Sequence, residues 1–242
     1  RYSKGERKQI VEACKKRINQ FSYGYHLDRL GMLVPYLLLI ALRTGINLQP
    51  LLDLKIWSLK PSVLGDRQIL SIKKNRGYSS QNIDAGNSSN VDQLSGIQLT
   101  RRVVGLLEEV IRMTKGLRLL APDELKDNIW LIRSLDDAEV VVPVNPSSVY
   151  TAIQAFRDEF NLTSDSGEPL NLNISRMRPT FAHSLLRING GDVRDLQKRL
   201  NHKDIRTTLL YIDPSEDEFK SKFKHSGLVM QQWVMSSNGR VV

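Results

Sequence analysis

Cysteine is nearly absent from this sequence, which has a single one, Cys14, among 242 residues. One cysteine forms no disulfide within the chain, and it cannot supply the several thiolates of a common structural zinc site. The composition therefore excludes a disulfide-stabilised secreted domain and argues against a zinc-finger domain. We predict that the chain works in a reducing compartment, the cytoplasm.

Long apolar runs are lacking as well. The longest lies near residues 33–42 and contains Pro35 and Tyr36, whereas a helix that spans a bilayer needs about 20 apolar residues. No signal peptide precedes this run, so a membrane protein is not expected. The sequence begins with Arg1 and not with methionine, and we expect an N-terminal portion of the protein to precede it.

Acidic residues are the minority among the charged ones, with 26 Asp and Glu against 35 Lys and Arg, and the formal net charge is +9. This excess favours a polyanionic partner. Nucleic acid comes first because the aromatic content of 7% is ordinary and no long basic amphipathic helix stands out, and a membrane surface is the weaker alternative. With 40% hydrophobic residues, the chain can bury the core of one large domain, with or without an appendage.

Apolar residues recur mostly at helical spacing, which predicts a mainly helical domain. A buried helix is expected within residues 32–44, ended by Thr44 and Gly45, and another is expected to start near Asn47, a plausible N-cap. The other expected helices lie within residues 1–30, 99–113, 147–160, 178–189, 192–200 and 204–212. Between residues 57 and 92, the run "QILSIKK", the polar turn "NRGYSS" and the run "QNIDAG" predict a β-hairpin with lysines at its tip.

Residues 176–213 combine many basic side chains with a histidine and a tyrosine. If the residues after His202 form a helix, the apolar residues of 205–212 share one face, and Tyr211 lies about 160° from Leu209. The tyrosine is therefore expected to point out of the core. The local excess of arginine and lysine predicts that this segment binds phosphate groups.

The spacing within this segment resembles that of the tyrosine recombinase, or phage integrase, family. In "LNHKDIRTTLLY", His202 stands nine residues before Tyr211, with two adjacent threonines between them, and Arg178 stands 24 residues before His202. The second motif region of the family has the form HxxR followed by LGHxxxxTTxxY. The resemblance covers roughly residues 3–213 and is strongest from Arg178 to Tyr211.

The resemblance implies a fold that is mainly α with a small antiparallel β-sheet, an α+β catalytic domain. That domain is expected to occupy residues 1–213. Residues 214–242 are expected to form a C-terminal tail, which docks on a neighbouring protomer or packs back onto its own domain. A separate N-terminal DNA-binding domain is expected outside this sequence. The implied activity is site-specific cleavage and rejoining of double-stranded DNA through a 3′-phosphotyrosyl intermediate, during integration or excision of a mobile element. The resemblance implies a homotetramer on DNA and neither a metal nor another cofactor.

The same resemblance assigns a role to each matching residue. Tyr211 corresponds to the nucleophile, and Arg178 corresponds to an arginine that grips the scissile phosphate with a bidentate geometry that lysine does not supply. His202 corresponds to the histidine that hydrogen-bonds the phosphate and helps to move protons. The lysine that protonates the leaving 5′-oxygen is expected on the hairpin, at Lys74 or Lys73.

Two positions depart from the family pattern. "TGINLQP" has Asn47 where the first arginine belongs and Pro50 where an acidic residue is frequent, and Ser175 stands where HxxR has its histidine. Asn47 and Ser175 can each donate a hydrogen bond to a phosphate oxygen, but neither brings a charge, and losing such a donor typically costs about 10²–10³ in rate. Two arginines are candidates for a substitute cation, Arg76 on the hairpin and Arg43, with Arg76 slightly preferred.

The missing charge leaves several hypotheses open. The protein is a recombinase with a weakened or substituted site, a DNA-binding protein that kept the fold and lost catalysis, or a relaxing enzyme that resembles type IB topoisomerases. Asn47 and Ser175 favour the non-catalytic hypothesis, whereas Arg178, His202 and Tyr211 oppose it. Simpler roles also exist, such as Asn47 as an N-cap alone or an unreactive exposed tyrosine at position 211.

Overall fold

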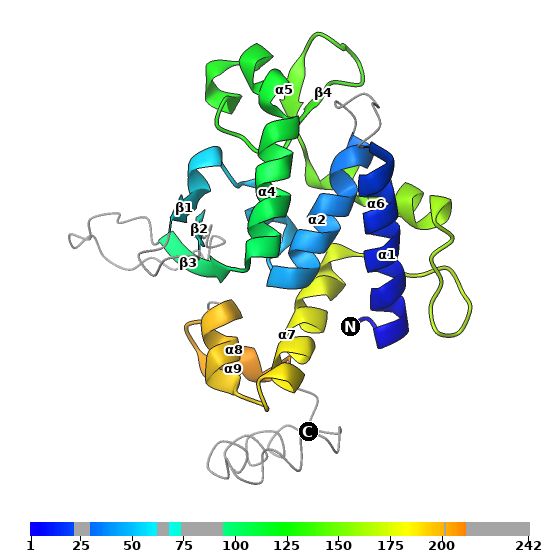
Figure 1. Cartoon of the computed structure of the whole chain (residues 1–242), viewed down its shortest axis with the longest axis vertical. Coiled ribbons are helices and arrows are strands. Elements are labelled where there is room, and N and C mark those ends of the chain that lie inside the picture. Colours follow the sequence, from blue (N-terminus) through cyan, green and yellow to red (C-terminus); the bar gives the residue numbers. More distant parts are fainter. Residues whose placement is uncertain (22–29, 62–67, 74–93, 201, 212–242) are drawn as a thin grey trace, which may run out of the picture. The chain divides into compact units, whose positions relative to one another are not determined.

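The computed structural model of the chain describes residues 1–21, 30–61, 68–73, 94–200 and 202–211 (Figure 1). The chain divides into two compact units, residues 1–178 and residues 179–242, which are described one after the other. Helices dominate the described residues, and their strands form two small antiparallel sheets. The predicted fold class, mainly α with a small antiparallel sheet, is confirmed.

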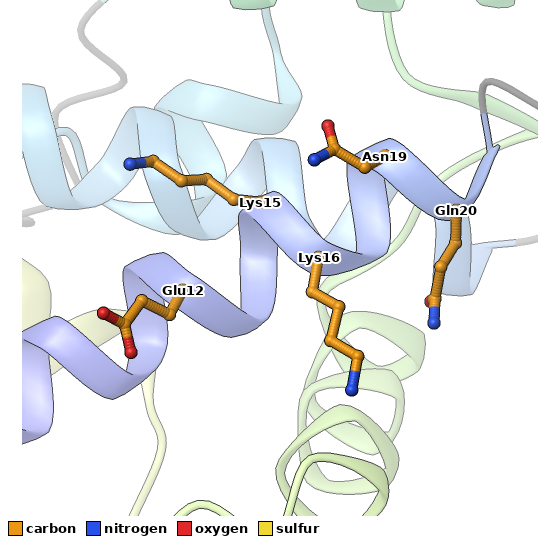
Figure 2. Close-up of a pocket in the computed structure, with 5 residues that line it drawn as sticks. All are labelled: Glu12, Lys15, Lys16, Asn19 and Gln20. Carbon is orange, nitrogen blue, oxygen red and sulfur yellow. The ribbon is translucent and has the colours of Figure 1, made fainter.

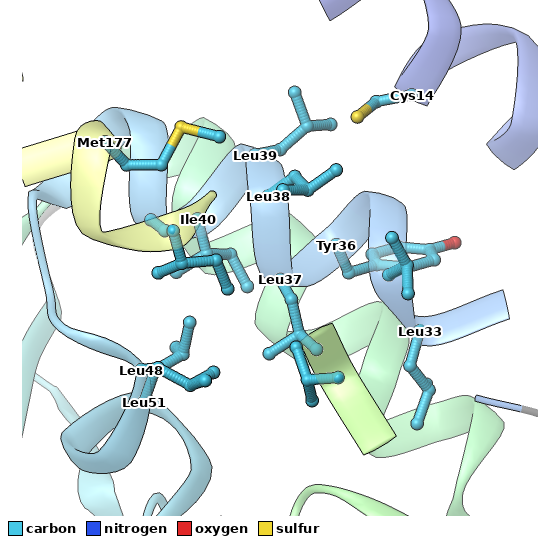
Figure 3. Packing of buried hydrophobic residues seen from close by; sticks show 14 of the residues in the cluster. Cys14, Leu33, Tyr36, Leu37, Leu38, Leu39, Ile40, Leu48, Leu51 and Met177 are labelled. Atoms are coloured by element: carbon cyan, nitrogen blue, oxygen red, sulfur yellow. The ribbon is translucent and has the colours of Figure 1, made fainter. Parts of the chain in front are cut away.

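Helix α2 (Leu30–Thr44) is the centre of the first unit. All its residues from 32 to 41 are buried, as the unbroken apolar run predicted. Helices α1 (Lys4–Phe21), α4 (Arg101–Met113) and α6 (Pro146–Glu159) pack around it (Figure 1). Figure 3 shows this core, in which the thiol of Cys14 from α1 joins the leucines of α2.

A glycine turn connects α2 to the short helix α3 (Leu48–Leu52). Gly45 has a φ of 67°, which a residue with a Cβ rarely adopts, and its amide closes the last turn of α2 by donating to the carbonyl oxygen of Ala41 at 2.8 Å. The indole N–H of the buried Trp130 donates to the carbonyl oxygen of Leu51 at 2.6 Å. The start of the turn and the helix that follows it are therefore both fixed to the core.

The three-stranded sheet of the first unit follows the 3₁₀ turn η1 (Ile56–Ser58) and has the order β1 (Leu59–Pro61), β2 (Gln68–Lys73), β3 (Leu94–Leu99). The strand expected at "QILSIKK" is confirmed as β2. Its predicted pairing with residues 81–86 is wrong, because β2 pairs antiparallel with β3, from Gln68 opposite Leu99 to Lys73 opposite Leu94. Residues 74–93, which include the predicted turn and its second run, lie outside the described residues.

The first unit also contains a small lobe, for which no prediction was made from the sequence. It contains α5 (Lys115–Leu120), the 3₁₀ turn η2 (Asp123–Leu125) and the two antiparallel strands β4 (Leu131–Arg133) and β5 (Val141–Pro143). Four buried apolar residues hold it together, namely Leu117, Ala121, Leu131 and Val141. Among the helices that the structure describes, none is both long and apolar enough to cross a membrane.

The second unit is a small helical assembly. Helix α7 (Met177–Ile188) enters it from the first unit, and α8 (Val193–Leu200) and α9 (Ile205–Leu209) follow. Gly190 and Gly191, with φ of 65° and 89°, make the turn between α7 and α8. Among the described residues of this unit, the buried apolar cluster contains Ala182, Leu186, Val193, Leu196 and Leu200. Helix α9 ends three residues earlier than predicted, and Ile212 lies outside the described residues.

Candidate active site

The predicted site residues that the structure describes fall into two groups. Asn47, Ser175 and Arg178 belong to the first unit, and His202 and Tyr211 belong to the second. Each group is described within its own unit.

Arg178 is bonded to the turn that carries Asn47. Its Nη1 donates to the carbonyl oxygen of Gly45 at 2.7 Å. Asn47 follows two residues later as the N-cap of α3, and its exposed side chain makes no capping hydrogen bond. The N-cap interpretation is therefore right for the position of Asn47 and wrong for its side chain. The fold brings together the two motif segments "TGIN" and "SRMR", which lie far apart in the sequence.

Ser175 lies in the 3₁₀ turn η3 (Ile174–Arg176), which leads directly into α7. Its amide donates to Oδ1 of Asn173 at 2.9 Å, and its side chain is exposed. Arg178 is three residues further on, in the first turn of α7. The structure thus places Ser175 and Arg178 on one short, well-anchored stretch of backbone.

Arg43 occupies the last turn of α2 and is half-buried. Burial lowers the pKa of its guanidinium, and the positive charge of Arg102, in the first turn of α4, lowers it further. Two cations that repel each other at a partly buried position create a local positive potential, which attracts an anion. The electrostatics of Arg43 are therefore compatible with the predicted role of a substitute cation.

Of the hairpin residues in the predicted site, only Lys73 is among the residues that the structure describes. Lys73 is the last residue of β2, and the structure describes its backbone, which pairs with that of Leu94. Lys74 and Arg76 lie outside the described residues. The positions of the general acid and of the preferred substitute cation therefore stay predictions.

His202 and Tyr211 are stacked in the second unit. Their ring centroids are 5.6 Å apart, and the ring planes differ by 19°. Nδ1 of His202 lies 2.9 Å from Oγ1 of Thr208, a hydrogen bond that fixes the orientation of the imidazole. The amide of Tyr211 donates to the carbonyl oxygen of the same threonine at 3.1 Å. Thr208 was not predicted as a site residue, although its place in the threonine pair of "RTTLLY" was the available signal.

The phase of Tyr211 on a helical wheel predicted that its side chain points away from the apolar core. This prediction is wrong. Tyr211 is half-buried and packs against the apolar cluster of the second unit. The wheel fails here because α9 ends at Leu209, and Leu210 and Tyr211 form a turn whose side chains no longer follow 100° steps. In this turn the side chain of Leu210, and not that of Tyr211, is exposed, with 80% of its surface accessible.

Basic side chains are plentiful on the second unit. Arg206 hydrogen-bonds the carboxylate of Asp204, which also caps α9, and these bonds lower the pKa of Asp204. Arg199 forms an ion pair with Asp195 at 3.1 Å. The exposed basic residues of this unit include Arg187, Arg194, Lys198, Arg199, Lys203 and Arg206. The excess of basic side chains is therefore exposed at the surface, and two of the arginines each contact a different aspartate, Arg206 with Asp204 and Arg199 with Asp195.

A pocket of about 550 Å³ lies elsewhere, beside α1 (Figure 2). The side chains that line it are Glu12, Lys15, Lys16, Asn19 and Gln20. None of them belongs to the predicted site. Within the described ranges, no cluster of three or more histidine, cysteine, aspartate or glutamate side chains is arranged to hold a metal ion.

No protein-family model and no curated protein matches this chain, whereas solved structures do. A crystal structure of the XerH site-specific recombinase bound to its difH substrate, a pre-cleavage complex, matches 94% of this chain and 53% of that chain, with a TM-score of 0.58 and 15% identity. The Tn1549 transposon integrase in complex with circular intermediate DNA matches 92% of this chain and 66% of that chain, with a TM-score of 0.59 and 15% identity. The chain thus spans about half of the recombinase chain and has the fold of tyrosine recombinase catalytic domains.

Proposed function

We propose that this chain is the catalytic domain of a tyrosine-type site-specific recombinase. It cleaves and rejoins double-stranded DNA through a 3′-phosphotyrosyl intermediate, during integration or excision of a mobile element. The observation that carries the proposal is the stacking of His202 on Tyr211 with the buried Thr208 behind them. A phenol beside an oriented imidazole, in a fold that it shares with DNA-bound recombinases, is an arrangement suited to nucleophilic attack on a phosphodiester.

The proposed reaction uses the phenolic oxygen of Tyr211 as the nucleophile. This oxygen forms a bond to the scissile phosphorus while the bond from phosphorus to the 5′-oxygen breaks, and the leaving oxygen takes a proton from Lys73 or Lys74. Arg178 donates to the non-bridging oxygens, where negative charge increases in the transition state. His202 holds the phosphate and accepts the phenolic proton of Tyr211 as the new bond forms. Rejoining is the reverse step, in which a 5′-hydroxyl attacks the phosphorus and the phenolic oxygen of Tyr211 leaves.

The neutral residues Asn47 and Ser175 take part as hydrogen-bond donors to the same phosphate. Arg76 or Arg43 supplies the missing charge in this proposal. Arg76 was preferred from the sequence, and the repulsion between Arg102 and Arg43, which favours an anion beside Arg43, supports the second candidate. Replacing the true substitute cation by alanine would lower the cleavage rate much more than the affinity for DNA.

The wider assembly follows from the same proposal. Residues 1–213 form the catalytic domain, residues 214–242 form a tail that docks on a neighbouring protomer, and a further DNA-binding domain completes the protein, as the greater length of the matched chains suggests. Four protomers act on two DNA duplexes in the cytoplasm. Two alternatives compete with this proposal. The first is a DNA-binding protein without catalysis, which the absence of a charge at Asn47 favours. The second is an enzyme that relaxes DNA as type IB topoisomerases do.

The experiment is a covalent-adduct assay. A target duplex is selected from a random library by binding, nicked near the cleavage position so that the released strand diffuses away, and incubated with protein in a chelator. Wild type is expected to form a protein–DNA adduct, and Tyr211→Phe is expected to form none while its affinity changes by less than about twofold, because one hydroxyl adds little to many phosphate contacts.

Tyr150→Phe is the matched control, because Tyr150 is an exposed tyrosine on α6. It should form the adduct at the wild-type rate. Binding without an adduct by the wild-type chain would support the non-catalytic alternative. An adduct that survives in Tyr211→Phe would remove Tyr211 as the nucleophile.

A further inference from the structure

The hydroxyl of Tyr2 is buried against the segment that leads into α7. It accepts a hydrogen bond from the amide of Asn173 at 2.7 Å, and it donates towards the carbonyl oxygens of Asn173 at 2.9 Å and Asn171 at 3.2 Å. Only 3% of the surface of Tyr2 is accessible. Burial raises the pKa of this phenol, which therefore stays protonated and able to donate. One side chain thus fixes several backbone groups of residues 171–173.

Arg176 completes the same contact. Its guanidinium lies over the ring of Tyr2, 4.1 Å from the centroid, and donates to the carbonyl oxygens of Asn171 at 2.8 Å and Arg1 at 2.7 Å. The buried carboxylate of Glu6 is 3.8 Å away. Arg176 is one of the basic side chains of residues 176–213, the segment that was predicted to bind phosphate groups. The structure instead directs its guanidinium into the protein.

Glu6 joins this contact to the start of α1. Its Oε2 accepts from the amide of Ser3 at 2.8 Å, and its own amide donates to Oγ of Ser3 at 3.1 Å. This reciprocal pair is a capping box, which fixes the first turn of a helix. The cluster of Tyr2, Glu6, Asn173 and Arg176, here named the N-terminal clamp, therefore attaches residues 171–176 to a rigid helix end.

The N-terminal clamp lies directly before the site residues of the first unit. Oδ1 of Asn173 accepts from the amide of Ser175 at 2.9 Å, and Met177, fully buried in the large core, fixes the start of α7. Arg178 is the next residue, with its side chain bonded to Gly45. A shift of the backbone at residues 171–176 would therefore move both Ser175 and Arg178.

We propose that Tyr2 and Arg176 are positioning residues for the phosphate-binding half of the site, a proposal that rests on the function proposed above. They touch no reacting atom. They hold the backbone from which Ser175 and Arg178 reach the scissile phosphate. Because a displacement of about 1 Å can cost about 10²-fold in rate, even a modest loosening of this clamp slows cleavage while most of the DNA contacts persist.

Tyr2→Phe tests this proposal, because it keeps the ring under Arg176 and removes the hydroxyl. The rate of adduct formation by bound protein is expected to fall about 10-fold, with DNA affinity within about twofold of wild type. Tyr36→Phe is the matched control, since Tyr36 is as buried as Tyr2 and has no hydrogen-bonded hydroxyl within the described residues. Its rate should equal that of wild type, and an equal rate for Tyr2→Phe would overturn the proposal.

A double-mutant cycle separates positioning from a general loss of structure. In the Arg178→Lys background, adding Tyr2→Phe should slow cleavage clearly less than it does in the wild-type background, because one of the two groups that the clamp positions has already been changed. If the two effects multiply fully, Tyr2 does not act through Arg178, and the proposal fails.

Amide hydrogen exchange gives a second readout that needs no cleavage. Tyr2→Phe should speed exchange at Asn173 and Ser175 and leave the amides of α2 unchanged. Unchanged exchange at both residues would contradict the clamp. If the wild-type chain forms no adduct, the proposed function fails, and the exchange measurement still decides whether Tyr2 holds this segment.

Discussion

Arg178 and Tyr211 are held in place in different ways. Arg178 bonds to the carbonyl oxygen of a glycine turn that is anchored to the large core around α2, and the N-terminal clamp fixes the backbone before it. Tyr211 follows a five-residue helix and packs on a cluster of five buried side chains. Less buried apolar surface means that local opening costs less free energy. Among the described residues, Arg178 is thus tied to the larger core, and we expect the part of the chain that carries Tyr211, the proposed nucleophile, to open at lower cost.

The largest effect on the cleavage rate is expected when the guanidinium of Arg178 is removed. We expect Arg178→Ala to slow cleavage of bound DNA by about 10²–10³-fold, as for the loss of one preorganised donor to a charged transition state. Single-turnover adduct formation measures this rate, and filter binding measures the affinity. Arg187→Ala, an exposed arginine on the same helix, should at most weaken binding. Equal rates for both variants would contradict the role of Arg178.

A cavity in the small core around α8 should loosen only the part of the chain that carries Tyr211, the proposed nucleophile. Leu196 is fully buried there, and Leu196→Ala is expected to cost about 2–5 kcal/mol of the free energy of unfolding of this part. The amides of α8 and α9 should then exchange faster, those of α2 should not, and adduct formation should decrease. Leu37→Ala in the large core is the matched change.

The two leucine variants test whether the halves differ. We expect Leu37→Ala to lower the protection of α2 and the melting temperature of the first unit. If Leu196→Ala instead reduced the protection of every helix equally, the two parts would open together, and the contrast between them would be wrong.

The smallest of these effects is expected at Thr208. Thr208→Val keeps the shape of the buried side chain and removes its hydrogen bond to Nδ1 of His202. Since positioned acid–base groups contribute about 10²–10⁴-fold, partial loss of the imidazole orientation should slow cleavage about 10-fold. Thr207→Val, at the exposed neighbour, should cleave as wild type does. A normal rate for Thr208→Val would mean that the stacking on Tyr211 alone orients His202.

The parts of the fold that depend on local sequence could be predicted. Helix α2 followed from its apolar run, its end followed from Gly45, and the spacing from Arg178 through His202 to Tyr211 indicated the fold. Local patterns suffice for the helix and its end because burial on all sides and a positive φ are each encoded within a few residues. The motif spacing is read directly from residue types and their separation.

Contacts between distant residues could not be predicted in the same way. The partner of β2 was misplaced because register depends on how a long connection folds, which periodicity does not encode. The side of Tyr211 was misjudged because α9 ends early. The N-terminal clamp escaped notice since it joins Tyr2 to Asn173, 171 residues apart, and an arginine beside a motif looks like a phosphate ligand until its partners are known.

The most direct measurement of the central claim is the identity of the bond that joins protein to DNA. The trapped adduct is digested with protease and nuclease, and the modified peptide is sequenced by mass spectrometry. The account predicts that Tyr211 carries the nucleotide through its 3′-phosphate and that the released strand has a 5′-hydroxyl. A link to another residue, or a link through a 5′-phosphate, would contradict it.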